Sequence, residues 1–192
     1  MKILGVACSP RKGKATFVAL RECLAAAAGL QPGVETDLIE LAGLDIGGCV
    51  ACGQCKKGPA CSIEDDFNDL VPRLSDPDVR GMIIAAPVYL RTMASQCKAF
   101  LDRAILLKRN GARFRNRIGG VLAVGQVRNG GQELTVQAVQ ATLLAHDMLC
   151  VHGAALWSGG PGGVEGDEAG LEAARGVGRR VAELAAMQRT AP

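Results

Sequence analysis

The chain has few aromatic residues, few histidines and no long apolar run, and each shortage narrows what it can be. Aromatic side chains make up 3% of the 192 residues, so the stacking surfaces that bind single-stranded nucleic acids are not expected. His146 and His152 lie without an acid–base constellation around them, so we interpret both as structural and assign no catalytic residue. No stretch reaches the roughly 18 apolar residues that a membrane span needs.

Nothing in the sequence divides it into parts or marks it for export. It has no internal repeat and no Pro- or Ser-rich linker, so residues 1–192 are expected to form a single domain. The apolar run after Met1 is too short for a signal peptide, and Arg11 and Lys12 follow at once. We therefore expect a cytoplasmic protein, in which eight cysteines indicate metal or redox chemistry rather than disulfides.

Apolar runs alternate with helical patterns along the whole chain. Strands are predicted over residues 3–8, 34–41, 81–86, 118–124 and 149–155, and helices over 16–28, 94–107, 134–145 and 171–187. Pro87 is expected to end the third strand. Five strands separated by helices require a parallel sheet covered on both faces, which predicts a doubly wound α/β fold of the flavodoxin-like type with strand order 2-1-3-4-5.

The segment between the first strand and the first helix has the properties of a phosphate-binding loop. A helix N-terminus offers free N–H groups, Ser9 and Thr16 add hydroxyls, and Arg11 adds a charge-assisted fork. The loop lacks G-x-G-x-x-G, and Ala15 stands where a P-loop has a hydroxyl residue. An ordinary capped turn with exposed basic residues remains the alternative.

Three separated segments resemble one family. Residues 9–12 (Ser-Pro-Arg-Lys), 87–89 (Pro-Val-Tyr) with 98–103 (Lys-Ala-Phe-Leu-Asp-Arg), and 130–133 (Gly-Gly-Gln-Glu) are similar to loops of the NADPH-dependent FMN reductase-like proteins of the flavodoxin-like fold. The resemblance spans roughly residues 3–155 and places the three loops at one sheet edge. It implies a flavin-dependent oxidoreductase that binds FMN.

The resemblance also implies which residues bind FMN. The first loop would hold the phosphate and the later loops would flank the isoalloxazine ring, which gives the set Ser9, Arg11, Lys14, Thr16, Pro87, Val88, Tyr89, Leu90, Thr92, Gly125, Gly130 and Gly131. The chain departs from the family at three positions. Cys8 replaces a usual Gly, Ala15 replaces a common Asn, and Arg91 occupies a place that is more often small.

Four of the eight cysteines lie close together. Cys49, Cys52, Cys55 and Cys61 follow the spacing C-x2-C-x2-C-x5-C within a loop at residues 47–62. Three cysteines at this spacing can surround one cubane, as in bacterial ferredoxins, and Cys61 would supply the fourth ligand of a single [4Fe-4S] cluster. Structural zinc, an unused remnant and reversible disulfide chemistry remain alternatives.

The cysteine motif on this fold is similar to that of iron–sulfur flavoproteins, and Asp65 and Asp66 after the fourth cysteine fit the same pattern. The resemblance implies electron transfer between a ferredoxin-like carrier and a two-electron acceptor through the cluster and FMN, in a homodimer or homotetramer. An NAD(P)H-dependent FMN or quinone reductase without a cluster is the first alternative, and a binding module without cofactor is the second.

The sequence does not decide the roles of two further segments. The basic run from Lys108 to Arg117 is expected to be a solvated loop, with docking of an acidic electron carrier or a nicotinamide phosphate as the alternative. The Gly-rich segment 159–170 is expected to form a mobile loop, either a lid or a subunit contact.

Overall fold

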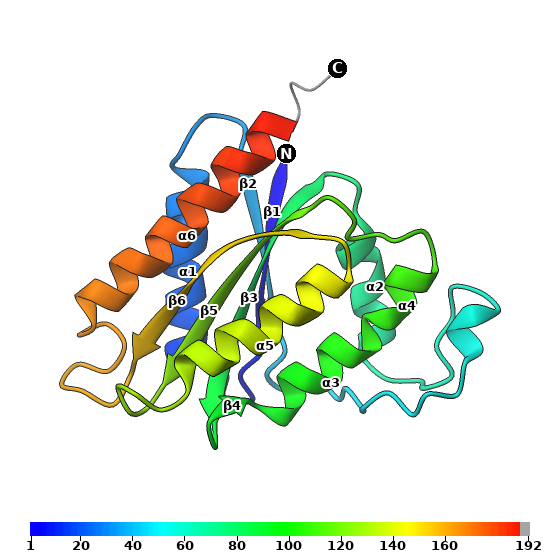
Figure 1. Ribbon diagram of the computed structural model, residues 1–192, viewed down its shortest axis with the longest axis horizontal. Helices are drawn as coiled ribbons and strands as arrows, with labels where there is room; N and C mark the ends of the chain where they lie inside the picture. The colour runs from blue at the N-terminus through cyan, green and yellow to red at the C-terminus, as the bar shows by residue number, and fades with distance from the viewer. Residues whose placement is uncertain (189–192) are drawn as a thin grey trace.

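The computed structural model describes residues 1–188, which are built around one twisted sheet (Figure 1). Its five parallel strands are β1 (Lys2–Ala7), β2 (Glu35–Glu40), β3 (Val79–Tyr89), β5 (Ile118–Gly125) and β6 (Leu149–Trp157), in the order β2-β1-β3-β5-β6. The short β4 (Thr92–Met93) pairs antiparallel with the end of β3. With β4 set aside, this is the 2-1-3-4-5 order of the flavodoxin-like fold.

Burial along the strands explains their sequence patterns. Every residue of β5 is buried, and β3 is buried over most of its length, as expected for central strands covered on both faces. The edge strands β2 and β6 are partly exposed, and each carries a polar side chain at an exposed or half-buried position, such as Asp37 in β2 and His152 in β6. The continuous apolar runs therefore mark the middle of the sheet.

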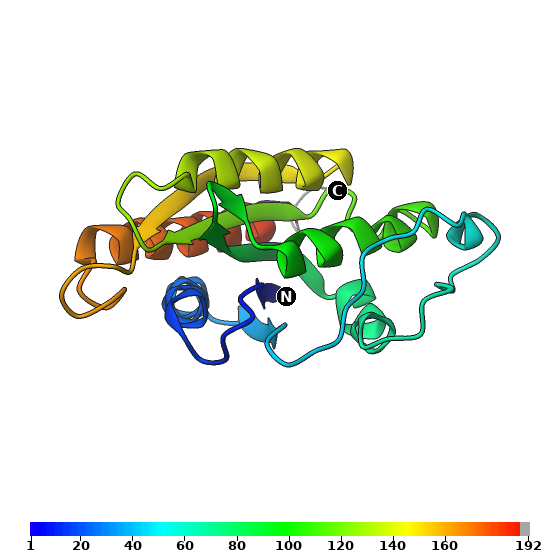
Figure 2. The same ribbon diagram turned by 90° about the horizontal axis from the view of Figure 1, so that it is seen from below.

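Helices cover the two faces of the sheet (Figure 2). One face carries α1 (Ala15–Ala28) and α6 (Glu168–Met187), which pack so closely that a Cβ on Gly178 would lie 2.0 Å from the carbonyl oxygen of Cys23. The other face carries α2 (Phe67–Ser75), α3 (Ser95–Arg103), α4 (Ile105–Arg109) and α5 (Gln132–Ala145). Each face has its own apolar core cluster.

The expectation that Pro87 ends the third strand was wrong. β3 continues through Pro87 to Tyr89 because Pro87 lies beyond the last residue of β1, where no ladder acceptor needs its missing N–H. Its carbonyl turns to the same side and accepts a hydrogen bond from the N–H of Ala94, which closes the β3–β4 hairpin.

The helix predicted over 94–107 is two helices, since the backbone hydrogen bonds shift at Ala104 and Leu107 bonds to the carbonyl three residues back. Helix α2 was not predicted. Pro72 lies inside it, exposed on its outer side, and the core-facing residues Phe67, Leu70 and Leu74 still hold the helix on the sheet.

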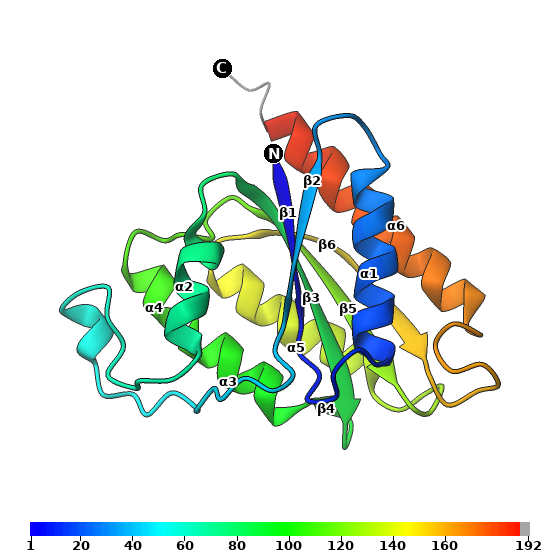
Figure 3. The ribbon, with the colours of Figure 1, turned by 180° about the vertical axis from the view of Figure 1, so that it is seen from behind.

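The loops that follow the strands lie at one edge of the sheet, except for the cysteine loop, which extends from the body beside α3 and α4 (Figure 3). It contains the 3-10 helix η1 (Gln54–Lys56). The helices described in residues 1–188 are all too short or too polar to cross a membrane.

Candidate functional site

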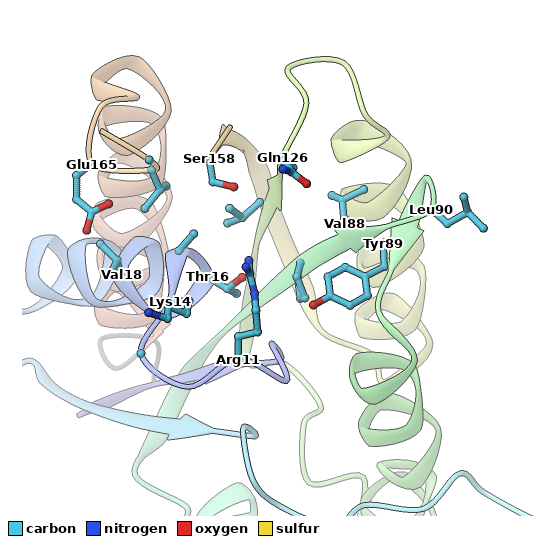
Figure 4. Close-up of a pocket in the computed structure, with 16 residues that line it drawn as sticks. Arg11, Lys14, Thr16, Val18, Val88, Tyr89, Leu90, Gln126, Ser158 and Glu165 are labelled. Carbon is cyan, nitrogen blue, oxygen red and sulfur yellow. The ribbon is translucent and has the colours of Figure 1, made fainter. Parts of the chain in front are cut away.

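A cavity of about 870 Å³ opens at the carboxyl ends of the strands, where doubly wound folds bind their ligands. Figure 4 shows Arg11, Lys14 and Thr16 on one side of it and Val88 and Tyr89 on the other. The full lining comprises Arg11, Gly13, Lys14, Ala15, Thr16, Val18, Pro87, Val88, Tyr89, Leu90, Val124, Gln126, Ser158, Gly163, Val164 and Glu165.

The first side of the cavity is prepared for an anion. Within residues 1–188, no side chain caps the N-terminus of α1 at Lys14, which leaves its first N–H groups free, and Thr16 is buried in the first turn. Arg11 adds a guanidinium. Ser9 does not line the cavity: its hydroxyl accepts the Arg11 N–H at 3.1 Å and so shapes the loop from beneath.

The loop is also braced from β2. The Glu40 carboxylate accepts the N–H of Gly13 at 2.6 Å, and Gly13 has a left-handed φ of 64°. This bond fixes the turn just before α1 begins.

The second side of the cavity is the strained β3–β4 hairpin. Its central residues Leu90 and Arg91 both have positive φ, 45° and 79°, in a two-residue turn that normally uses glycine or asparagine. Leu90 is 97% exposed and Tyr89 44%, so little packing offsets the strain. Strain of this kind is concentrated at ligand sites.

The predicted flavin residues thus divide into two groups. Seven line the cavity, namely Arg11, Lys14, Thr16, Pro87, Val88, Tyr89 and Leu90. Five do not, namely Ser9, Thr92, Gly125, Gly130 and Gly131. Gly131 supports the hairpin from behind, because a Cβ there would lie 2.2 Å from the carbonyl oxygen of Arg91, and Gly125 packs on Gln132.

Sequence reasoning missed nine lining residues. They are Gly13, Ala15 and Val18 around the first loop, with Val124, Gln126, Ser158 and the segment 163–165. The ends of β5 and β6 could have been expected at this edge from the strand order alone. Glu165, an acid opposite the basic loop, had no sequence signal; it lies in the Gly-rich segment.

Hydrogen bonds join the two ends of the cysteine loop. Asp45 and Asp66 exchange two hydrogen bonds, with the backbone N–H of each donating to an oxygen of the other. One step inward, the Asp65 carboxylate accepts the N–H of Gly47 at 2.9 Å. The two predicted acids therefore close the loop, although neither lines the cysteine cavity.

All four loop cysteines line a second cavity of about 30 Å³ between the loop and α3 and α4. The Arg109 guanidinium donates to the sulfur of Cys55 at 3.0 Å, and Asn110 holds the Cys55 carbonyl. Cys52 lies 3.0 Å from the Ser62 hydroxyl. No residue lines both this cavity and the larger one.

Cys52 of the loop differs chemically from the buried Cys8 and Cys23. The hydrogen bond with Ser62, helped by the Gln54 N–H and by Arg109, lowers the pKa of the Cys52 thiol. Burial raises the pKa of Cys23 to about 12, and burial and the neighbouring Cys97 raise that of Cys8 well above its usual range. Thiolates bind metals, so Cys52 suits ligation, whereas Cys8 and Cys23 stay protonated in the core.

The loop thiols share a cavity without meeting at a point. Within residues 1–188, no three His, Cys, Asp or Glu side chains are placed to hold one metal ion. Four thiolates around a single zinc would lie about 4 Å apart, since each Zn–S bond is about 2.3 Å. A [4Fe-4S] cubane holds its thiolates farther apart because each binds a different iron.

Fold and cavity together are those of a flavin-dependent oxidoreductase, and comparison with known proteins gives the family. A sequence profile of the NADPH-dependent FMN reductase family matches residues 1–161, and the chain belongs to that family.

Its relatives include iron–sulfur flavoproteins. The chain is 37% identical over 192 residues to one from Methanocaldococcus jannaschii, covering 96% of this chain and 97% of that protein. It is 37% identical over 153 residues to one from Methanosarcina thermophila, covering 80% and 75%.

Solved structures show the same fold at low sequence identity. RosB with a bound riboflavin-phosphate intermediate superposes with a TM-score of 0.77 at 18% identity, covering 99% of this chain and 81% of that one. A WrbA-like flavodoxin from Agrobacterium tumefaciens gives 0.69 at 18% identity, covering 97% and 98%.

Proposed function

We propose that this protein is an FMN-binding iron–sulfur flavoprotein that transfers electrons between a one-electron donor and a two-electron acceptor. The observation that carries the proposal is the pairing, on one chain, of a cavity with a cationic end and a separate cavity lined by four cysteines. The names of its iron–sulfur flavoprotein relatives support the same reading.

FMN fits the larger cavity by size and by charge. Its phosphate would lie against Arg11, Lys14, Thr16 and the free N-terminus of α1. Pro87, Val88, Tyr89 and Leu90 would flank the ring, while Ser9, Thr92, Gly125, Gly130 and Gly131 shape the surrounding loops. Bound FMN would supply chemistry by one or two electrons, and the chain positions it and controls access.

The donor set of the cysteine loop supports a [4Fe-4S] cluster. Cys49, Cys52, Cys55 and Cys61 would be its ligands, and Arg103 and Arg109 line the same cavity and offset the negative charge of thiolates. The cluster would supply one-electron exchange with a ferredoxin-like carrier. Lys56 and Lys57 lie in this loop without a carboxylate in ion-pair contact within the described chain, which favours an acidic carrier.

The test is to remove each cofactor independently. Cys52→Ala should lose iron and acid-labile sulfide and keep FMN, whereas Arg11→Ala should weaken FMN binding and keep iron, because the two cavities share no residue. Cys150→Ala, outside the loop, and Arg21→Ala, on the exposed side of α1, are the matched controls and should keep both. Joint loss of both cofactors in either variant would contradict two separate sites.

An NAD(P)H-dependent FMN or quinone reductase without a cluster is the second candidate. It is favoured by the family profile and by a relative from Chromohalobacter salexigens named NAD(P)H dehydrogenase (quinone), 27% identical over 174 residues with 80% of this chain covered. Rapid flavin reduction by NADPH, with no one-electron carrier present, would identify it.

The separation of the two cavities supports an oligomer. The cysteine loop lies at one end of the long axis of the molecule, and the loop before α6 lies at the other (Figures 1 and 3). A homodimer or homotetramer could bring the cysteines of one subunit toward the flavin cavity of another.

A further inference from the structure

Arg103 is a charged side chain buried inside the protein. Its side chain is 1% exposed, at the C-terminal end of α3 beneath the cysteine loop. A buried guanidinium is tolerated only when its donors are satisfied. The hydrogen-bond partners of its three nitrogens therefore indicate the role of Arg103.

The two terminal nitrogens of Arg103 form hydrogen bonds with both ends of the cysteine loop. One donates to the Asp65 carboxylate at 2.5 Å and to the Gly47 carbonyl at 3.0 Å, and the other donates to Asp65 at 2.9 Å and to the Ile63 carbonyl at 3.3 Å. Gly47 and Ile63 lie just outside the first and last cysteines. Arg103 thus joins both ends of the cysteine segment to α3.

The third nitrogen of the guanidinium group, Nε, is unpaired. It is buried and, within the described chain, has no hydrogen-bond partner that meets normal geometry. Arg103 lines the same small cavity as the four cysteines. One terminal nitrogen of Arg103 donates to the carbonyl of Ile63, so the guanidinium is held two residues along the chain from Cys61. Burial lowers the pKa of Arg103, but Asp65 and the Cys61 sulfur together raise it above its ordinary value, in keeping with a contact to Cys61.

A donor facing a cluster ligand has a defined effect. Hydrogen bonds to the sulfurs of an iron–sulfur cluster stabilise its reduced form, which carries one more negative charge, and so raise the reduction potential. The effect is strong in a buried site, where the dielectric is low.

We propose that Arg103 is a positioning residue for the cluster, whose Nε–H is donated to the sulfur of Cys61 once the cluster is bound and thereby raises its reduction potential. This inference rests on the proposed function, since it requires a cluster on the four cysteines. Arg109 contacts Cys55 through a terminal nitrogen in an exposed pair, which makes it the matched comparison for the buried Arg103.

The test uses the loaded wild-type protein. Arginine labelled with ¹⁵N at Nε is incorporated, the cluster is reduced with dithionite without oxygen, and pulsed electron paramagnetic resonance measures nitrogen coupling to the cluster spin. We expect a ¹⁵N coupling that Arg103→Lys loses and that the matched control Arg109→Lys keeps. The Arg103→Lys cluster should also show a midpoint potential shifted to more negative values.

The outcomes separate this inference from the proposed function. Wild-type protein without iron and sulfide would overturn the proposed function. A loaded wild-type cluster with no ¹⁵N coupling, or with a coupling that survives in Arg103→Lys, would overturn the role of Arg103 alone. If Arg103→Lys does not bind the cluster, the ¹⁵N coupling in the wild-type spectrum decides the question. Asp65→Asn leaves Arg103 and its Nε in place and weakens only the hydrogen bonds between Arg103 and Asp65, so it should retain the coupling.

Discussion

Gly131 shows how a residue outside the cavity can determine its shape. It precedes α5 with a φ of 113°, and a Cβ there would meet the backbone of Arg91, not a movable side chain. The hairpin beside the cavity can take its position only because this residue has no side chain.

Gly131→Ala should therefore weaken FMN binding by about tenfold or more, because the hairpin has to move. The control is Gly33→Ala, where φ is 85° and nothing lies within 4 Å of the new Cβ. That variant should lose roughly 1 kcal/mol of stability from backbone strain alone and bind FMN normally. Flavin fluorescence titration measures the FMN affinity of both variants. Equal affinity would show that the position of the hairpin does not affect FMN binding.

At the scale of single residues, sequence reasoning reached the chemistry better than the geometry. Arg11, Lys14 and Thr16 were predictable because a loop opening a helix needs donors for a phosphate. The strained φ values of Leu90 and Arg91 were not, since neither residue type favours such a turn. Arg103 was predicted only as part of a resemblance, because its partners Gly47 and Asp65 are joined to it by the fold.

The elements of the sheet were predictable because the fold agrees with local preference. The apolar runs of β1, β3 and β5 are buried on both faces, so pattern and burial coincide. Helix α2 was not predicted because Pro72 lies in its middle, which argues against a helix in the sequence. The helix forms because its apolar side packs on the sheet.

The joint between α5 and β6 predicts a pH dependence. His146 ends α5, is buried, and packs on Phe114 with ring centroids 5.0 Å apart. Burial, together with Lys108 of α4, lowers its pKa, and Asp147 offsets this in part. The unfolded chain, with the ordinary pKa of about 6.5, then binds the proton more readily than the folded chain does.

Stability should therefore be complete above about pH 6.5 and should fall as the pH drops below that value. Melting temperatures between pH 7.5 and 5.5 measure it, a window above most carboxylate titration. His146→Gln should flatten the dependence, whereas His152→Gln, at an exposed position, should keep it. An unchanged slope in His146→Gln would place the titrating group elsewhere.

The whole molecule combines two separate cavities, each a proposed cofactor site, in one small chain. The parallel sheet makes the first, because it gathers the loops after β1, β3, β5 and β6 around a single cavity. The loop after β2 makes the second, held away from the sheet edge by Asp65, Asp66 and Arg103. Sequence spacing predicted the cysteines as a group, but only the structure places them away from the flavin cavity.

The measurement that tests this account most directly is the content of FMN, iron, zinc and acid-labile sulfide per chain, on protein purified without oxygen. The account predicts one FMN with about four irons and four sulfides, the stoichiometry of one cluster on four cysteines. FMN with zinc or with no metal would contradict the cluster and favour the plain reductase. Absence of FMN, even after incubation with it, would contradict the flavin site itself.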